Sequence, residues 1–349
     1  RISEEAVIPL TRRRLLQLSG SATALATLGA ARSGAEDEGS LPAPILALQP
    51  HTDGTEPITV DEHRARLARA QALLTETGLD ALVVGPGSGL TYFTGAEWWL
   101  SERFFGMVLF RAGDPVWVTP AFERDRALEK IRIGDDVRAW EEDASPWRLV
   151  AGALEDRGVA TGSVGIEETM PFAFSDGIAQ AAPAVRLTSG TPVTAGCRMV
   201  KDAHERALMH RASEITRRAH RAVFASLREG TTVEEARAWC AAAHRRLGVR
   251  GGALVLFGKD AAFPHGTTTP QALSAGDVVL IDGGGGLHGY SSDITRTGVF
   301  GAPPTDRQRK IWGLVRRAQA AAFEAARPGV ECQAVDAAAR QVIEEGGFG

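Results

Sequence analysis

Cysteine is scarce in this sequence, whose 349 residues include only Cys197, Cys240 and Cys332. The three lie far apart and none belongs to a Cys-x-x-Cys pair, which excludes a zinc-ribbon site and an obvious disulfide framework. A cysteine without a metal or disulfide partner usually behaves as a small apolar side chain. We therefore expect all three to be buried.

Excess positive charge and long apolar segments are also missing. The formal net charge is −4, and no basic cluster is interleaved with aromatic residues, so nucleic acid is excluded as an expected partner. A weakly apolar stretch at residues 18–31 is too short and too mild to form a stable membrane span. With 44% hydrophobic and 23% charged residues, the composition is that of a globular protein long enough for two domains.

An initiator methionine is absent, because the sequence begins with Arg1, and we expect a fragment of a longer reading frame. Arg12, Arg13 and Arg14, followed by the apolar stretch and by small residues at 33–35, resemble a twin-arginine export signal. Residues 1–35 are therefore expected to be a signal peptide that directs the protein to the periplasm or the medium, with a disordered basic tail as the alternative. Residues 36–59, rich in proline, glycine and acidic residues, are expected to be a linker.

Helical and strand patterns alternate along the rest of the chain. The expected elements are a helix at 61–76, strands at 80–84, 90–95, 105–110 and 115–119, and a turn at 85–89. This alternation predicts an α/β domain over residues 60–194. Beyond it, the expected elements are helices at 203–228, 232–247, 306–326 and 335–345 and strands at 253–257 and 278–281. His210, His220 and His244 lie among arginines on these helices and are expected to face solvent.

Two carboxylates flank a glycine-rich segment near the end of these patterns. Asp282 ends the apolar run 278–281, Gly283 to Gly286 are expected to form a turn, and residues 294–300 are expected to form the returning strand. On one extended strand, Asp282 and Asp293 would be on the order of 36 Å apart, whereas a hairpin brings them together. Two buried like charges are costly unless a cation lies between them, so the pair predicts a metal site. The alternative is a hairpin in which the two residues only cap turns.

The same block resembles the signature of the pita-bread metallopeptidases, which include prolidase, aminopeptidase P and methionine aminopeptidase. The matching features are the spacing of the two aspartates, the Gly289-Tyr290 pair, and the run from Asp293 to Thr297. Upstream, Pro264-His265-Gly266 resembles a segment of the prolidase and aminopeptidase P branches. Residues 78–123 resemble the N-terminal domain of creatinase and prolidase, which methionine aminopeptidases generally lack. Trp98, Trp99 and Phe104 in that segment are expected in its core, with a dimer surface as the alternative.

The resemblance implies an α/β (α+β) fold with a creatinase/prolidase-like N-terminal domain followed, over residues 195–349, by an incomplete pita-bread domain. It also implies a metal-dependent hydrolase that cleaves the bond before proline in a peptide or dipeptide, and a homodimer. Carried over to this sequence, Asp282 binds one divalent ion, Asp293 bridges two, and His265 is catalytic. Mn²⁺ is the first expectation for these ions, with Co²⁺, Zn²⁺ and Fe²⁺ also open.

The resemblance also exposes missing ligands, because the family's site adds a histidine and two glutamates further along. No histidine follows His288, and the later glutamates are Glu324, Glu331, Glu344 and Glu345. We therefore expect residues 1–349 alone to have negligible peptidase activity. The alternatives are a peptide-binding module without catalysis and a creatinase-like hydrolase of a small C–N substrate. Retention of both aspartates argues against each.

Overall fold

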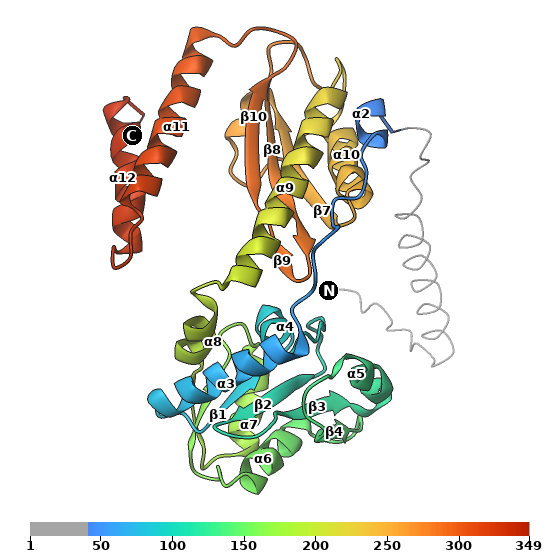
Figure 1. Ribbon diagram of the computed structural model, residues 1–349, viewed down its shortest axis with the longest axis vertical. Coiled ribbons are helices and arrows are strands. Elements are labelled where there is room, and N and C mark those ends of the chain that lie inside the picture. The colour runs from blue at the N-terminus through green and yellow to red at the C-terminus, as the bar shows by residue number, and fades with distance from the viewer. Residues whose placement is uncertain (1–40, 349) are drawn as a thin grey trace, which may run out of the picture.

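The computed structural model describes residues 41–348, which form two lobes, each built on its own β-sheet (Figure 1). The expected signal peptide at residues 1–35 and the beginning of the expected linker lie outside the described residues. None of the described helices combines the length and the apolarity that crossing a membrane requires. The mixed α/β architecture agrees with the fold class expected from the sequence.

The first lobe contains a six-stranded sheet in the order β4-β3-β2-β1-β5-β6. Its strands are β1 (Ala81–Val84), β2 (Gly106–Phe110), β3 (Val116–Pro120), β4 (Val137–Trp140), β5 (Ser163–Ile166) and β6 (Arg186–Ser189). Its helices are α3 (Val60–Glu76), α4 (Ser88–Thr94), η2 (Ala121–Glu123), α5 (Arg124–Lys130), α6 (Pro146–Asp156), α7 (Phe172–Ala181) and α8 (Thr191–Arg198). The β1–β2 and β2–β3 pairs are antiparallel and the remaining pairs are parallel.

Both faces of this sheet are covered, which explains why β1 reads as an uninterrupted apolar run. Leu82 and Val84 belong to one hydrophobic cluster, whereas Ala81 and Val83 belong to another on the opposite face. Trp98 and Phe104 are buried in these clusters, as expected, whereas Trp99 is 51% exposed. The expected strand at 90–95 is wrong, because these residues lie in helix α4, which ends at Gly95 in a left-handed conformation.

The second lobe has a four-stranded sheet in which β8 lies between β7 and β10, and the short β9 pairs with β8. The strands are β7 (Arg250–Phe257), β8 (Val278–Leu287), β9 (Tyr290–Ser291) and β10 (Ile294–Val299). The helices are α2 (Ala43–Leu46), α9 (Ala203–Ser226), α10 (Val233–Arg246), η3 (Gly258–Ala262), α11 (Asp306–Ala325) and α12 (Cys332–Glu345). Helices α9 and α10 pack on one face of the sheet, while α11 and α12 pack on each other beside it (Figure 1).

Four of the long helices, α3, α9, α10 and α11, begin where the sequence supplies capping boxes. Thr59 with Glu62 opens α3, Asp202 with Glu205 opens α9, Thr232 with Glu235 opens α10, and Thr305 with Gln308 opens α11. In each box the two residues satisfy backbone N–H groups that the first helical turn would otherwise leave unpaired. These starts are therefore determined locally.

Three expectations need correction in this lobe. The turn expected at Gly283 to Gly286 is wrong, because β8 continues to Leu287 and the chain reverses at His288 and Gly289, both with positive φ. Cys197 and Cys240 are buried as expected, but Cys332 is exposed at the start of α12, which buries none of its residues. The segment expected to be a linker also contributes to the core, since Ile45 is fully buried in the cluster between α9, α10 and the sheet.

Candidate active site

Asp282 lies in the middle of β8, on the sheet face that α9 and α10 do not cover. Alternate residues of β8 explain this placement, because Val279 and Ile281 belong to the core beneath the helices, which puts Asp282 on the other side. Its cross-strand partners are Leu254 on β7 and Thr295 on β10. Thr295 Oγ1 donates a hydrogen bond to Asp282 Oδ1. The carboxylate is therefore oriented by its neighbour and partly accessible.

Asp293 lies on the same face, next to the end of β10. Ile294 pairs with Gly283 and Ser291 pairs with Gly286, so the intervening residues keep the same register and Asp293 lies opposite Gly284. Asp293 is two residues from Thr295, the direct partner of Asp282. The register therefore makes the two aspartates diagonal neighbours on one face of the sheet.

The expected catalytic residue, His265, lies in the exposed loop between η3 and β8. The next residue, Gly266, has a φ of +83°, and a Cβ placed there would approach Leu254 Cδ1 to 3.0 Å. Leu254 is the cross-strand partner of Asp282, so the Pro264-His265-Gly266 loop folds over the same face of the sheet. The tertiary structure thus brings all three expected site residues to one side, without a direct contact of His265 with either aspartate.

The donor set on this face suits a divalent ion. Two carboxylates on neighbouring strands provide oxygen ligands and negative charge, which Mn²⁺ and similar ions accept. Within residues 41–348, no group of three or more His, Cys, Asp or Glu side chains is arranged to hold a metal. The described chain therefore supplies two fitting ligands, fewer than a closed metal site requires.

Two histidines on the helix side of the sheet contradict the expectation that they face solvent. His220 on α9 is 2% exposed and His244 on α10 is fully buried, whereas His210 is exposed. The reason is helical periodicity: His220 follows the buried Thr216 by four residues, and His244 follows the buried Cys240 by four. This spacing was available in the sequence, but the neighbouring arginines obscured it.

Burial, together with the nearby His244 and Arg296 and opposed by Asp282, lowers the pKa of His220 to about 4. Burial also lowers the pKa of His244. Neither ring nitrogen of His220 has a hydrogen-bond partner in the part of the chain that the structure describes. Both imidazoles are therefore neutral in the folded protein at neutral pH, and a proton on His220 would be buried with no hydrogen-bond acceptor among the described residues.

This pKa shift predicts a loss of stability in mild acid. An unfolded histidine gains its proton as the pH falls below 6.5, while folded His220 stays neutral until the pH approaches 4. The unfolded state therefore binds the extra proton, and stability should fall by about 3 kcal/mol between about pH 7 and about pH 4 from this residue. Urea unfolding across this range should show that the free energy of unfolding depends less on pH in His220→Leu than in the wild type.

His210→Leu, at an exposed position on the same helix, is the control and should keep the pH dependence of the wild type. Equal pH dependence in the wild type and His220→Leu would contradict the assignment.

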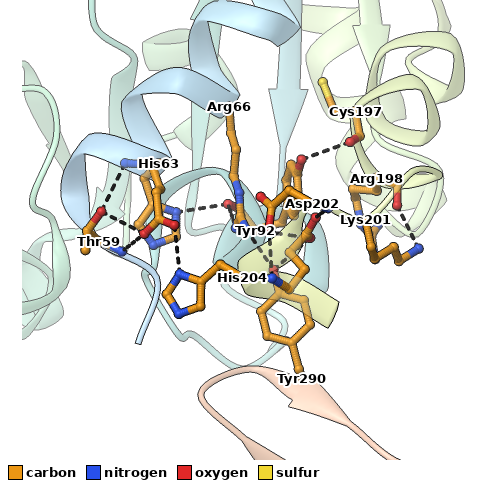
Figure 2. Close-up of polar contacts among 12 residues, drawn as sticks. Thr59, His63, Arg66, Tyr92, Cys197, Arg198, Lys201, Asp202, His204 and Tyr290 are labelled. Atoms are coloured by element: carbon orange, nitrogen blue, oxygen red, sulfur yellow. Dashed lines mark hydrogen bonds and ion pairs between the residues drawn. The ribbon is translucent and has the colours of Figure 1, made fainter. Parts of the chain in front are cut away.

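A buried polar cluster joins the two lobes near the turn that precedes Asp293 (Figure 2). Arg66 on α3 donates to the Tyr92 carbonyl at 3.0 Å and to Tyr290 Oη at 2.8 Å. The Tyr290 hydroxyl donates in turn to Glu205 Oε1 at 2.8 Å, and the Arg66 guanidinium lies 3.6 Å from the same carboxylate. The Arg66 and Glu205 side chains are only 7% and 4% exposed, so the pair is largely withdrawn from water.

A second link joins the same two helices, one turn earlier on α3 and at the residue before Glu205 on α9. Glu62 Oε1 is 2.7 Å from His204 Nδ1, and hydrogen bonding from the Thr59 backbone, with help from His204, lowers the Glu62 pKa to about 2. The hydrogen bond to Glu62 raises the His204 pKa. Because both links connect α3 to the start of α9, they fix the junction of the lobes (Figure 2).

A cavity of about 760 Å³ opens at this junction. It is bordered by cationic side chains, including Arg132, Arg198 and Lys201, and by the β8–β9 turn at His288. Among the described residues that border it, none is one of the three expected site residues. The expected site residues are therefore separate from the lining of this cavity.

Comparison with known proteins gives two family matches that divide the chain as the lobes do. Residues 207–349 match the family described as metallopeptidase family M24, and residues 66–200 match the creatinase/prolidase N-terminal domain. Among curated relatives, the probable dipeptidase PepE of Mycobacterium tuberculosis is 34% identical over 300 residues, covering 84% of this chain and 79% of that protein. The Xaa-Pro dipeptidase of Pyrococcus horikoshii is 27% identical over 282 residues, covering 79% of this chain and 75% of that protein.

Comparison with solved structures gives the same kinds of relatives as the sequence comparison. Dipeptidase PepE from Mycobacterium ulcerans superposes with a TM-score of 0.74 at 33% identity, covering 84% of this chain and 79% of that one. A prolidase from Thermococcus sibiricus also gives 0.74, at 26% identity, covering 82% of this chain and 78% of that one. Fold, domain order and sequence similarity therefore lead to the same conclusion, and the chain belongs to metallopeptidase family M24.

Proposed function

We propose that this protein is an Xaa-Pro metallopeptidase, a hydrolase that uses two divalent ions to cleave the peptide bond before proline. Mn²⁺ is the first candidate for both ions. The observation that carries the proposal is the diagonal placement of Asp282 and Asp293 on one accessible sheet face, with the His265 loop folded over it. Membership of family M24 supports divalent-metal hydrolysis of peptides. Relatives named Xaa-Pro dipeptidase support the preference for proline.

The residues of this chain have distinct parts in the proposed reaction. Asp282, oriented by Thr295, and Asp293 supply the negative charge that holds the ions. Divalent ions bound there would lower the pKa of a water molecule and polarise the peptide carbonyl. The imidazole of His265, on the same side of the sheet, would donate a hydrogen bond to the carbonyl oxygen as negative charge develops on it.

A pair of matched dipeptides tests the proposal. Protein stripped of metal with EDTA and reloaded with Mn²⁺ should hydrolyse Ala-Pro much faster than Ala-Ala, and the EDTA-treated protein should hydrolyse neither. Comparing Ala-Pro with Ala-Pro-Gly then separates a dipeptidase from an aminopeptidase. The assay belongs in a protein that includes the expected histidine and glutamate ligands. Equal rates on Ala-Pro and Ala-Ala would contradict the preference for proline and indicate a general dipeptidase. Hydrolysis without Mn²⁺ would contradict the proposed metal chemistry.

A further inference from the structure

The glycines of β7 and β8 make room for a histidine. Gly251 and Gly285 are cross-strand partners, and a Cβ on either would lie 2.6 or 2.7 Å from His244 Cδ2. Real Cβ atoms do not approach carbon so closely. The His244 ring on α10 therefore lies directly against bare backbone of both strands, on the face opposite Asp282.

From this position His244 begins a line of short polar contacts that leads to the segment carrying Asp293. His244 Nδ1 is 2.8 Å from the Cys240 carbonyl oxygen, and Nε2 is 3.1 Å from Thr216 Oγ1. Thr216 Oγ1 is 2.7 Å from Ser292 Oγ, which lies 3.2 Å from both the N–H and the carbonyl oxygen of Gly285. Thr216 and His244 are fully buried and Ser292 is 9% exposed, so water does not compete for these contacts.

The chemistry of the groups fixes the direction of each hydrogen bond. A carbonyl oxygen only accepts, so His244 Nδ1 donates to Cys240 and the neutral ring has a lone pair on Nε2. Thr216 must then donate its single hydroxyl hydrogen to Nε2, which leaves Ser292 to donate to Thr216. The Ser292 oxygen in turn accepts from the Gly285 N–H. The Gly285 carbonyl oxygen, 3.2 Å from Ser292 Oγ, would need the same hydroxyl hydrogen, and the shorter 2.7 Å contact with Thr216 favours donation to Thr216.

The line ends at the residue before Asp293. Side chains alternate across a strand, so Ser292 points to the helices while Asp293 lies on the opposite, accessible face. The Ser292 backbone N–H also donates to the Gly285 carbonyl at 3.1 Å. Backbone and side chain of Ser292 are thus both tied to β8, which limits the movement of the next residue.

We propose that Thr216 and His244 are positioning residues for Asp293. By hydrogen bonding on the helix-covered face of the sheet, they hold Ser292 in place, and Ser292 in turn determines the position of the Asp293 carboxylate on the accessible face. This inference rests on the proposed role of Asp293 as a metal ligand. Neither Thr216 nor His244 touches the ion or the substrate. Hydrogen-bonded supports of metal ligands typically change metal affinity by about tenfold to a hundredfold when removed.

Thr216→Val tests the proposal because valine keeps the shape but has no hydroxyl. Amide hydrogen exchange at Gly285 and at residues 292–295 should accelerate by about tenfold, and Mn²⁺ affinity, from isothermal titration with Mn²⁺ alone, should fall by about tenfold. Thr216→Ser should restore both values. If valine at position 216 prevents folding, Ser292→Ala removes the same hydrogen bond by deleting the serine hydroxyl. It should then accelerate amide exchange and lower Mn²⁺ affinity in the same way.

Thr94→Val is the matched control, since Thr94 is equally buried and makes two hydrogen bonds in the other lobe. It should alter neither exchange at residues 292–295 nor Mn²⁺ affinity. The proposal is overturned if Thr216→Val matches the wild type in both readouts, or if Thr94→Val changes them as much. Lack of Mn²⁺ binding by the wild type, in the form that includes the expected histidine and glutamate ligands, would instead contradict the proposed function, and the exchange comparison would still decide whether Thr216 holds the Ser292 segment.

Discussion

Asp293→Asn is expected to abolish peptide hydrolysis and to lower the bound divalent metal. Asparagine has nearly the same shape as aspartate, so the β8–β10 register around Gly284 should survive. Its amide has no negative charge with which the side chain would hold divalent cations. In the protein that includes the expected histidine and glutamate ligands, we expect kcat/KM on Ala-Pro to fall by at least about a thousandfold, which corresponds to about 4 kcal/mol of transition-state stabilisation.

The measurement pairs steady-state kinetics with metal analysis of the purified protein. Asp306→Asn provides the control, because Asp306 is also an aspartate in the second lobe but its side chain is 99% exposed on α11. That variant should keep the activity and metal content of the wild type. Unchanged turnover and unchanged metal in Asp293→Asn would refute the assignment of the metal site to this face.

Arg66→Met is expected to give the largest loss of stability among the substitutions considered. Methionine fills similar space but leaves the Glu205 carboxylate, 4% exposed, without its cation and leaves Tyr290 without a donor. Breaking a buried pair from one side typically costs about 3–5 kcal/mol, because the remaining charge stays buried. The double variant Arg66→Met with Glu205→Gln should recover part of this loss, since it removes that charge.

Arg64→Met is the control on the same helix. The Arg64–Asp114 pair has the shorter distance of 3.1 Å, but its side chains are 49% and 48% exposed. Exposed ion pairs contribute about 0–1 kcal/mol to the free energy of unfolding. Burial and not distance should therefore decide how much stability the two variants lose. Urea unfolding of the four proteins measures it, and a loss in Arg66→Met no larger than in Arg64→Met would show that the junction does not depend on this pair.

The sequence identified the candidate site because its residues are close in the chain and are of types that bind metals or transfer protons. Asp282 ends an apolar run, Asp293 follows a chain reversal, and His265 precedes both by a short segment. Local signals also set the starts of α3, α9, α10 and α11, where capping boxes satisfy the first backbone N–H groups. The roles given to the three residues remain predictions.

The glycine run shows where local reasoning failed. Consecutive glycines usually mark a turn, because they tolerate positive φ, but Gly283 to Gly286 are extended in β8. They are small because other groups approach them: His244 lies against Gly285, and a Cβ on Gly284 would meet the Ser292 carbonyl oxygen. Those neighbours come from α10 and from across the sheet, so the sequence around the glycines does not reveal them.

By itself, the sequence determined the two-domain α/β class, the positions of most elements of the second lobe, and the aspartate pair. Only the tertiary structure decided that the buried His220 and His244 lie behind that pair, that Ile45 enters the second core, and that Arg66 joins the lobes through Glu205 and Tyr290. The physical reason is the range of the interactions. Capping and strand alternation act within a few residues, whereas burial and ion pairing depend on surfaces that meet only after the chain has folded.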